Sequence, residues 1–115
     1  LSDFSKTLSK DIEIDFYQSN TEGEIIDKIQ NSKKYKGLII NPAAYTHTSI
    51  AIADAIKGAG ITAVEVHLSN IHAREEYRKK SFISPVSMGV VAGFGKNSYK
   101  LALLGLYKHF CKNNE

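Results

Sequence analysis

Residues 37–67 read GLIINPAAYTHTSIAIADAIKGAGITAVEVH, and this stretch decides the fold. It opens at 37–41 with a short apolar run, typical of a buried parallel strand. Residues 46–57 place Ile50, Ala53 and Ile56 at helical spacing, and Gly58 or Gly60 ends the helix. Residues 61–67 are a second strand. A strand, a helix and a second strand form a right-handed crossover, so the stretch predicts a parallel sheet.

The alternation of strands and helices continues on both sides of this unit. We predict further strands at 12–16 and 88–92 and helices at 1–10, 22–33, 71–80 and 97–111, the last with Leu101, Leu104 and Phe110 inward. This order implies an α/β fold of three layers, a doubly wound parallel sheet covered on both faces. The chain opens inside a helix pattern, whereas such sheets start on a central strand. We therefore expect that a segment before residue 1 exists or has been lost.

Length and composition predict one domain, residues 1–115, without membrane spans or structural disulfides. The chain has one cysteine and no apolar run of about 18 residues, and residues 1–6 contain no signal-peptide core. The net charge of +3 is scattered, without the basic stripe that nucleic-acid binding needs. No His/Cys spacing resembles a zinc site, and Gly93-Phe94-Gly95 lacks the third glycine of a dinucleotide motif.

Polar residues cluster where the predicted strands end. Asn41 ends one strand, Glu65 and His67 close the next, and Leu68 and Ser69 form the turn that follows. In open α/β sheets the ligand binds beyond the carboxyl ends of the strands. We therefore expect a site at this edge, where backbone N–H groups near a helix start favour an anion.

His47 and Asp54 form a second candidate pair. His47 stands at the predicted start of a helix, and Asp54 lies two turns later on the same face. At ~1.5 Å per residue they are about 10 Å apart along the axis, too far to touch. Asp54 could serve a neighbouring subunit. Alternatively, His47 caps the helix and Asp54 is only solvated.

Glu65 and His67 are two residues apart on a strand and therefore share one face. A carboxylate beside an imidazole can orient it as an acid or base. Arg74 and Arg78 follow on one helix face, suited to one anionic ligand. The alternative is a structural Glu–His pair with a solvated arginine face, and the convergence of these groups at one edge favours the site.

The motifs NPAAYTHTS (41–49) and EVHLSNIHAREEYR (65–78) closely resemble the two signature segments of type II 3-dehydroquinate dehydratase. QSNTEGE (18–24) and GVVAGFG (89–95) are also similar, so the resemblance covers essentially the whole chain. It implies a flavodoxin-like domain, a cytoplasmic dodecamer built as a tetramer of trimers, and no metal or cofactor. It also implies dehydration of 3-dehydroquinate to 3-dehydroshikimate by anti elimination through an enolate, in the shikimate pathway or a catabolic quinate route.

The resemblance also assigns residue roles. His67 matches the general acid and Glu65 the carboxylate that orients it. The positions that match substrate contacts are Asn41, His47, Leu68, Ser69 and Arg78, with Asp54 reaching a neighbour's site and Arg74 supporting the site or a subunit contact.

One family feature has no counterpart in residues 1–115. The family's catalytic tyrosine and its activating arginine lie in a mobile lid after an Asn-Gly-Pro-Asn-Leu motif, which this sequence does not contain. Tyr45 is interpreted as packing, and Tyr99 is expected to lie away from the pocket. Two hypotheses follow: an enzyme whose first strand and lid precede residue 1, or a truncated relative that binds a small hydroxylated carboxylate without turnover.

Overall fold

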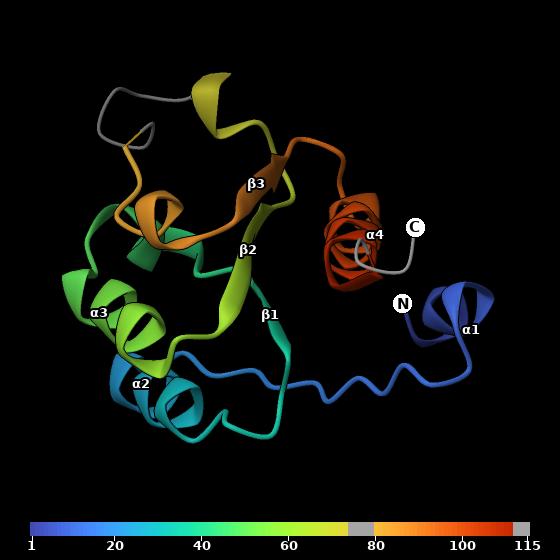
Figure 1. The fold of residues 1–115 in the computed structure, drawn as a ribbon. Coiled ribbons are helices and arrows are strands. Elements are labelled where there is room, and N and C mark those ends of the chain that lie inside the picture. Colours follow the sequence, from blue (N-terminus) through green and yellow to red (C-terminus); the bar gives the residue numbers. More distant parts are fainter. Residues whose placement is uncertain (74–79, 112–115) are drawn as a thin grey trace.

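Among the residues that the computed structural model describes, the sheet has three parallel strands in the order β1-β2-β3. The structure describes residues 1–73 and 80–111. The strands are β1 (Gly37–Ile40), β2 (Thr62–His67) and β3 (Gly89–Ala92) (Figure 1). The register pairs Ile40 with Glu65 and His67 with Ala92. The strands therefore end together at one carboxyl rim, as the sequence predicted.

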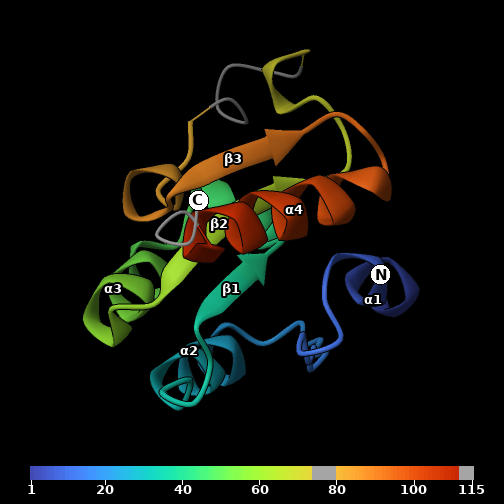
Figure 2. The same ribbon diagram turned by 45° about the vertical axis from the view of Figure 1, so that its right-hand side comes forward.

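Helices cover both faces of the sheet (Figures 1 and 2). Helices α2 (Glu22–Gln30) and α3 (Ile50–Ala59) pack on one face, where Ile29, Ile52 and Ile56 are buried. Helix α4 (Asn97–Cys111) packs on the other face, and α1 (Ser2–Leu8) lies beside it. The three-layer, flavodoxin-like α/β fold predicted from the sequence is confirmed.

Alternation along β2 decides on which face its polar residues lie. Val64 and Val66 pack toward α4, whereas Ala63 belongs to the core formed with α2 and α3. Because successive side chains of a strand point to opposite faces, Glu65 and His67 share the side of Ala63. The sheet thus places both of them in the layer of α3.

The predicted strand at 12–16 is wrong for this structure. Residues 12–19 have no regular secondary structure, and Phe16 is 67% exposed. A strand needs a neighbouring ladder for its backbone groups, and within the described residues β1 pairs only with β2. The segment is instead held by side chains: Lys6 Nζ donates to the carbonyl of Ile12, and the Tyr35 hydroxyl donates to Asp15.

One helix begins later than its sequence pattern predicts, and α4 has the predicted bounds but buries a different face. Residues 43–47 form a separate 3-10 turn, η1 (Ala43–His47), and α3 begins only at Ile50. Ile50 is consequently exposed, and Ile52 occupies the core position. In α4 the small residue Ala102 lies inward with Leu103 and Leu106, whereas Leu101 faces solvent. Small residues permit close packing but contribute little to a hydrophobic pattern.

Candidate active site

Glu65 and His67 form a buried hydrogen-bonded pair at the carboxyl end of β2. Glu65 is fully buried, His67 is 5% exposed, and His67 Nε2 lies 2.7 Å from Glu65 Oε2. With an ionised carboxylate, Nε2–H is the donor. The other ring nitrogen, Nδ1, is therefore the one that can exchange a proton with a ligand.

The second carboxylate oxygen of Glu65 is bound by two serine hydroxyls. Ser81 Oγ donates to Glu65 Oε1 at 2.7 Å, and Ser84 Oγ donates to the same atom at 3.0 Å. Neither serine is predicted by the sequence pattern. The available signal was indirect: a buried carboxylate beside one histidine still needs donors for its other oxygen.

The hydrogen bonds decide the ionisation of Glu65. Burial by itself disfavours the charged carboxylate, but hydrogen bonds from His67, Ser81 and Ser84, with the attraction of His67, outweigh it. Their net effect holds the pKa of Glu65 below its usual range. Glu65 is therefore a carboxylate near neutral pH, as an orienting partner of a histidine must be.

His47 is joined to the same region through the segment that carries Ser81. His47 Nδ1–H donates to the carbonyl of Lys80 at 2.7 Å, and the N–H of Phe82 donates to the carbonyl of Thr46 at 2.9 Å. The sequence suggested that His47 begins or caps α3, but the structure shows that it does neither. Ser49 is the cap, and its hydroxyl accepts from the N–H of Ile52 at 2.9 Å.

Asn41 follows β1 directly, and its amide group is held on both sides. Its Oδ1 accepts from the N–H of Ala43 at 3.2 Å, and its Nδ2 donates to the Tyr99 hydroxyl at 3.1 Å. The expectation that Tyr99 lies away from the pocket is therefore wrong. Tyr99 is in the first turns of α4, which begins at the rim after β3, so the topology brings it next to Asn41.

The turn after β2 is pinned by the loop that follows β3. The N–H of Gly93 donates to the carbonyl of His67 at 3.2 Å, and the N–H of Gly95 donates to the carbonyl of Leu68 at 2.8 Å. Gly93 has φ +96°, and a Cβ there would lie 3.4 Å from the Cβ of Asn70. Gly95 also has a positive φ, +58°, so both positions favour glycine through their backbone conformation.

The structure does not bring Asp54 to the rim. Asp54 is exposed on α3 and lines a groove of about 540 Å³ between α2 and α3. Arg74 and Arg78, with most of the predicted helix at 71–80, lie outside the described residues. Among the described residues, Asn41 follows β1, Glu65 and His67 end β2, and Leu68 and Ser69 follow them, while His47 is linked to Glu65 through the segment of Lys80 and Ser81.

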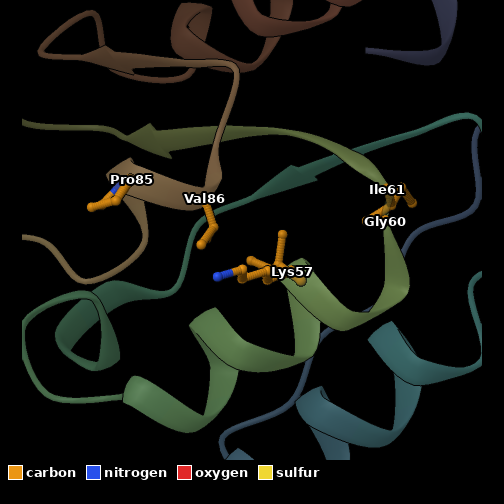
Figure 3. Close-up of a pocket in the computed structure, with 6 residues that line it drawn as sticks. Lys57, Gly60, Ile61, Pro85 and Val86 are labelled. Carbon is orange, nitrogen blue, oxygen red and sulfur yellow. The ribbon is translucent and has the colours of Figure 1, made fainter.

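A second cavity lies at the opposite end of β2. It has about 430 Å³ and is lined by Lys57, Gly60, Ile61, Pro85 and Val86, where the chain leaves α3 (Figure 3). It belongs to a different part of the molecule from the rim. Within residues 1–73 and 80–111, no three His, Cys, Asp or Glu side chains converge as metal ligands, and no helix has the length and apolar character to cross a membrane.

Fold and rim together define the class of protein: a flavodoxin-like α/β protein with a buried Glu–His pair beyond its parallel strands. The chain belongs to the class II dehydroquinase family, whose model, Dehydroquinase class II, matches residues 2–107.

Similar proteins carry the same family name. The chain is 60% identical over 96 residues to a 3-dehydroquinate dehydratase of Helicobacter hepaticus, covering 82% of this chain and 61% of that protein. It is 54% identical over 102 residues to a 3-dehydroquinate dehydratase of Geotalea daltonii, covering 88% of this chain and 71% of that protein. The crystal structure of a type II dehydroquinase from Butyrivibrio crossotus superposes with a TM-score of 0.86 at 44% identity, covering 91% of this chain and 73% of that one.

Proposed function

We propose that this protein acts as a type II 3-dehydroquinate dehydratase, a hydro-lyase of the shikimate pathway that converts 3-dehydroquinate to 3-dehydroshikimate. The observation that carries the proposal is the buried Glu65–His67 pair at the carboxyl rim of a chain from this family. The chain spans 61% of the length of the Helicobacter relative, so the activity is proposed for the protein that contains this domain.

His67 is the general acid in this proposal. A base removes the proton at C2 of the substrate and leaves an enolate. Collapse of the enolate forms the C1–C2 double bond and breaks the bond from C1 to its hydroxyl oxygen. His67 Nδ1–H protonates that oxygen, and water leaves. The ionised Glu65, 2.7 Å from Nε2, stabilises the doubly protonated ring that this step requires.

The family resemblance assigns the base to a lid tyrosine, and residues 1–115 do not contain the motif that precedes this lid. Two tyrosines near the rim are engaged otherwise. The Tyr45 hydroxyl donates to the carbonyl of Asn20 at 3.0 Å, and the Tyr99 hydroxyl accepts from Asn41. Both hydroxyls therefore make structural hydrogen bonds, and neither is assigned the proton abstraction.

The remaining site residues are proposed to bind the substrate. The N–H groups of Leu68 and Ser69, with the Ser69 hydroxyl, hold its carboxylate, as the family resemblance implies for this turn. The proposed contacts to the ring hydroxyls and the enolate region are Asn41, His47 and Arg78, with Arg74 supporting the site. No metal and no cofactor takes part in this mechanism.

The proposed assembly is a dodecamer, a tetramer of trimers, in the cytoplasm, built from a single domain over residues 1–115. Asp54 and Ile50 lie one turn apart on the exposed side of α3, and Ile50 is 58% exposed. Such a face suits a contact through which Asp54 reaches the site of a neighbouring subunit.

The activity is tested by following the ultraviolet absorbance of the enone carboxylate product. We expect turnover by the wild type and a loss of at least a hundredfold in kcat for His67→Gln, with substrate binding little changed, because an acid acts mainly in the transition state. His109→Gln, a histidine on α4, is the control and should retain full activity. Substrate binding by the full-length wild type without any product would identify a binding protein and reject the enzyme.

A further inference from the structure

Glu65 Oε1, the carboxylate oxygen that does not contact His67, is satisfied by side chains from one short segment. Ser81 and Ser84 reach it at 2.7 and 3.0 Å. The carboxylate has no solvent exposure in this structure, so its charge is held by protein donors. These two hydroxyls therefore determine the position of Glu65 Oε1.

The Ser81 hydroxyl is an oriented donor. A hydroxyl has one proton and two acceptor lone pairs. The N–H groups of Ile83 and Ser84 both donate to Ser81 Oγ at 3.0 Å. Two backbone donors thus occupy the acceptor side of the oxygen, and the proton is directed to Glu65 Oε1.

The segment that carries Ser81 is itself fixed to the rim. The carbonyl of Lys80 accepts from His47, and the N–H of Phe82 donates to Thr46. Ile83 is fully buried in the core formed with α3. Ser81 therefore occupies a defined position relative to β2, and its hydrogen bond fixes the plane of the carboxylate whose other oxygen contacts His67.

We infer that Ser81 is a positioning residue for His67, acting through Glu65, with Ser84 as a second and longer contact. The inference rests on the proposed function for its catalytic consequence. Ser81 keeps Glu65 ionised and keeps Oε2 directed at Nε2. The His67 ring is thereby held with Nδ1 presented to the substrate.

The charge of Glu65 reports this interaction directly. The donors favour the carboxylate, so removing the Ser81 hydroxyl must raise the pKa of Glu65. Among the described residues His67 is the titratable group in contact with Glu65. The charged residues of the packed elements, Asp54 and Lys57 on α3 and Lys80 before Ser81, are exposed to solvent.

The test compares Ser81→Ala with Ser81→Thr and Ser87→Ala in the full-length protein. Ser87 is the matched control because its hydroxyl donates to the carbonyl of Ile83 at 2.8 Å, in the same segment. Carbon-13 NMR of the Glu65 carboxyl, assigned with Glu65→Gln, and nitrogen-15 NMR of the His67 ring give readouts independent of activity. Kinetics across pH give the catalytic readout.

Ser81→Ala should raise the pKa of the Glu65 carboxyl, because the carboxylate loses a donor, and change the nitrogen-15 shift of His67 Nε2. It should lower kcat about 10- to 100-fold at nearly constant KM, with the acidic limb of the profile moved to higher pH. Ser81→Thr keeps the hydroxyl and should restore most of the wild-type Glu65 titration and kcat. Ser87→Ala should change neither the Glu65 titration nor kcat.

An unchanged Glu65 titration and an unchanged kcat in folded Ser81→Ala would overturn the inference. If Ser81→Ala does not fold, Ser84→Ala is measured in the same way; it should give a smaller shift in the same direction, and no shift would overturn the inference. A wild type without dehydratase activity would reject the proposed function, and the NMR titration would still decide whether Ser81 holds the Glu65–His67 pair.

Discussion

At the scale of single residues, the site contains side chains in which both polar atoms of the carboxylate or amide group have hydrogen-bond partners. Glu65 contacts His67 through one oxygen and two serines through the other. Asn41 is held by Ala43 through its oxygen and by Tyr99 through its nitrogen. A group fixed at both ends can present only one orientation to a ligand, and this pre-organisation is what a site needs to act in the transition state.

Tyr99→Phe tests the role of this hydrogen bond at Asn41. The substitution removes one acceptor from the Asn41 amide and leaves the ring in place. A neutral hydrogen bond contributes about 1 kcal/mol, so we expect a roughly fivefold loss in kcat/KM. Steady-state kinetics measure it. Tyr107→Phe on the same helix is the control, and equal effects of the two substitutions would show that the hydrogen bond to Asn41 is unimportant.

At the scale of elements, the first turn of α3 is set by its cap rather than by its hydrophobic pattern. The pattern predicted a helix from residue 46, but Ser49 accepts a backbone hydrogen bond and starts the helix at Ile50. This frees residues 43–47 to form the 3-10 turn that carries His47. The cap therefore separates a structural helix from a turn that belongs to the rim.

Ser49→Ala should destabilise the protein by about 1 kcal/mol, because the N–H of Ile52 loses its acceptor in a buried setting. Urea unfolding followed by circular dichroism measures the free energy. Thr21 is a matched control: it is the cap residue of α2 but makes no side-chain capping bond. Thr21→Ala should therefore cost much less, and a similar loss in both variants would contradict the role assigned to Ser49.

The sequence predicts features that depend on spacing along the chain better than contacts between residues far apart in the sequence. Strand and helix order, the rim at Asn41 and His67, and the shared face of Glu65 and His67 follow from spacing along the chain. Ser81 is 16 residues from Glu65 and Tyr99 is 58 from Asn41, and no local periodicity links them. The strand at 12–16 failed because pairing depends on a neighbour, which a pattern within one segment cannot supply.

At the scale of the whole molecule, the sheet, the layer of α3 and the segment 81–84 meet around the buried carboxylate of Glu65. Glu65 lies on the α3 face of the sheet, its serine donors precede and begin the turn η4 (Ser84–Val86), and the same segment is tied to η1. Ionised Glu65 therefore links the stability of this half of the fold to pH, because unfolding releases the carboxylate from its donors.

Glu65→Gln measures that link. The pKa of Glu65 is lowered in the folded protein, so unfolded chains bind its proton more readily, and the carboxylate stabilises the fold above its unfolded pKa. This contribution is lost as pH falls through the lowered, folded-state pKa. Urea unfolding of both proteins between pH 7 and pH 3 should show wild type more stable near neutrality and the difference shrinking with acid. A difference that stays constant over this range would mean that the donors around Glu65 do not favour its ionised form.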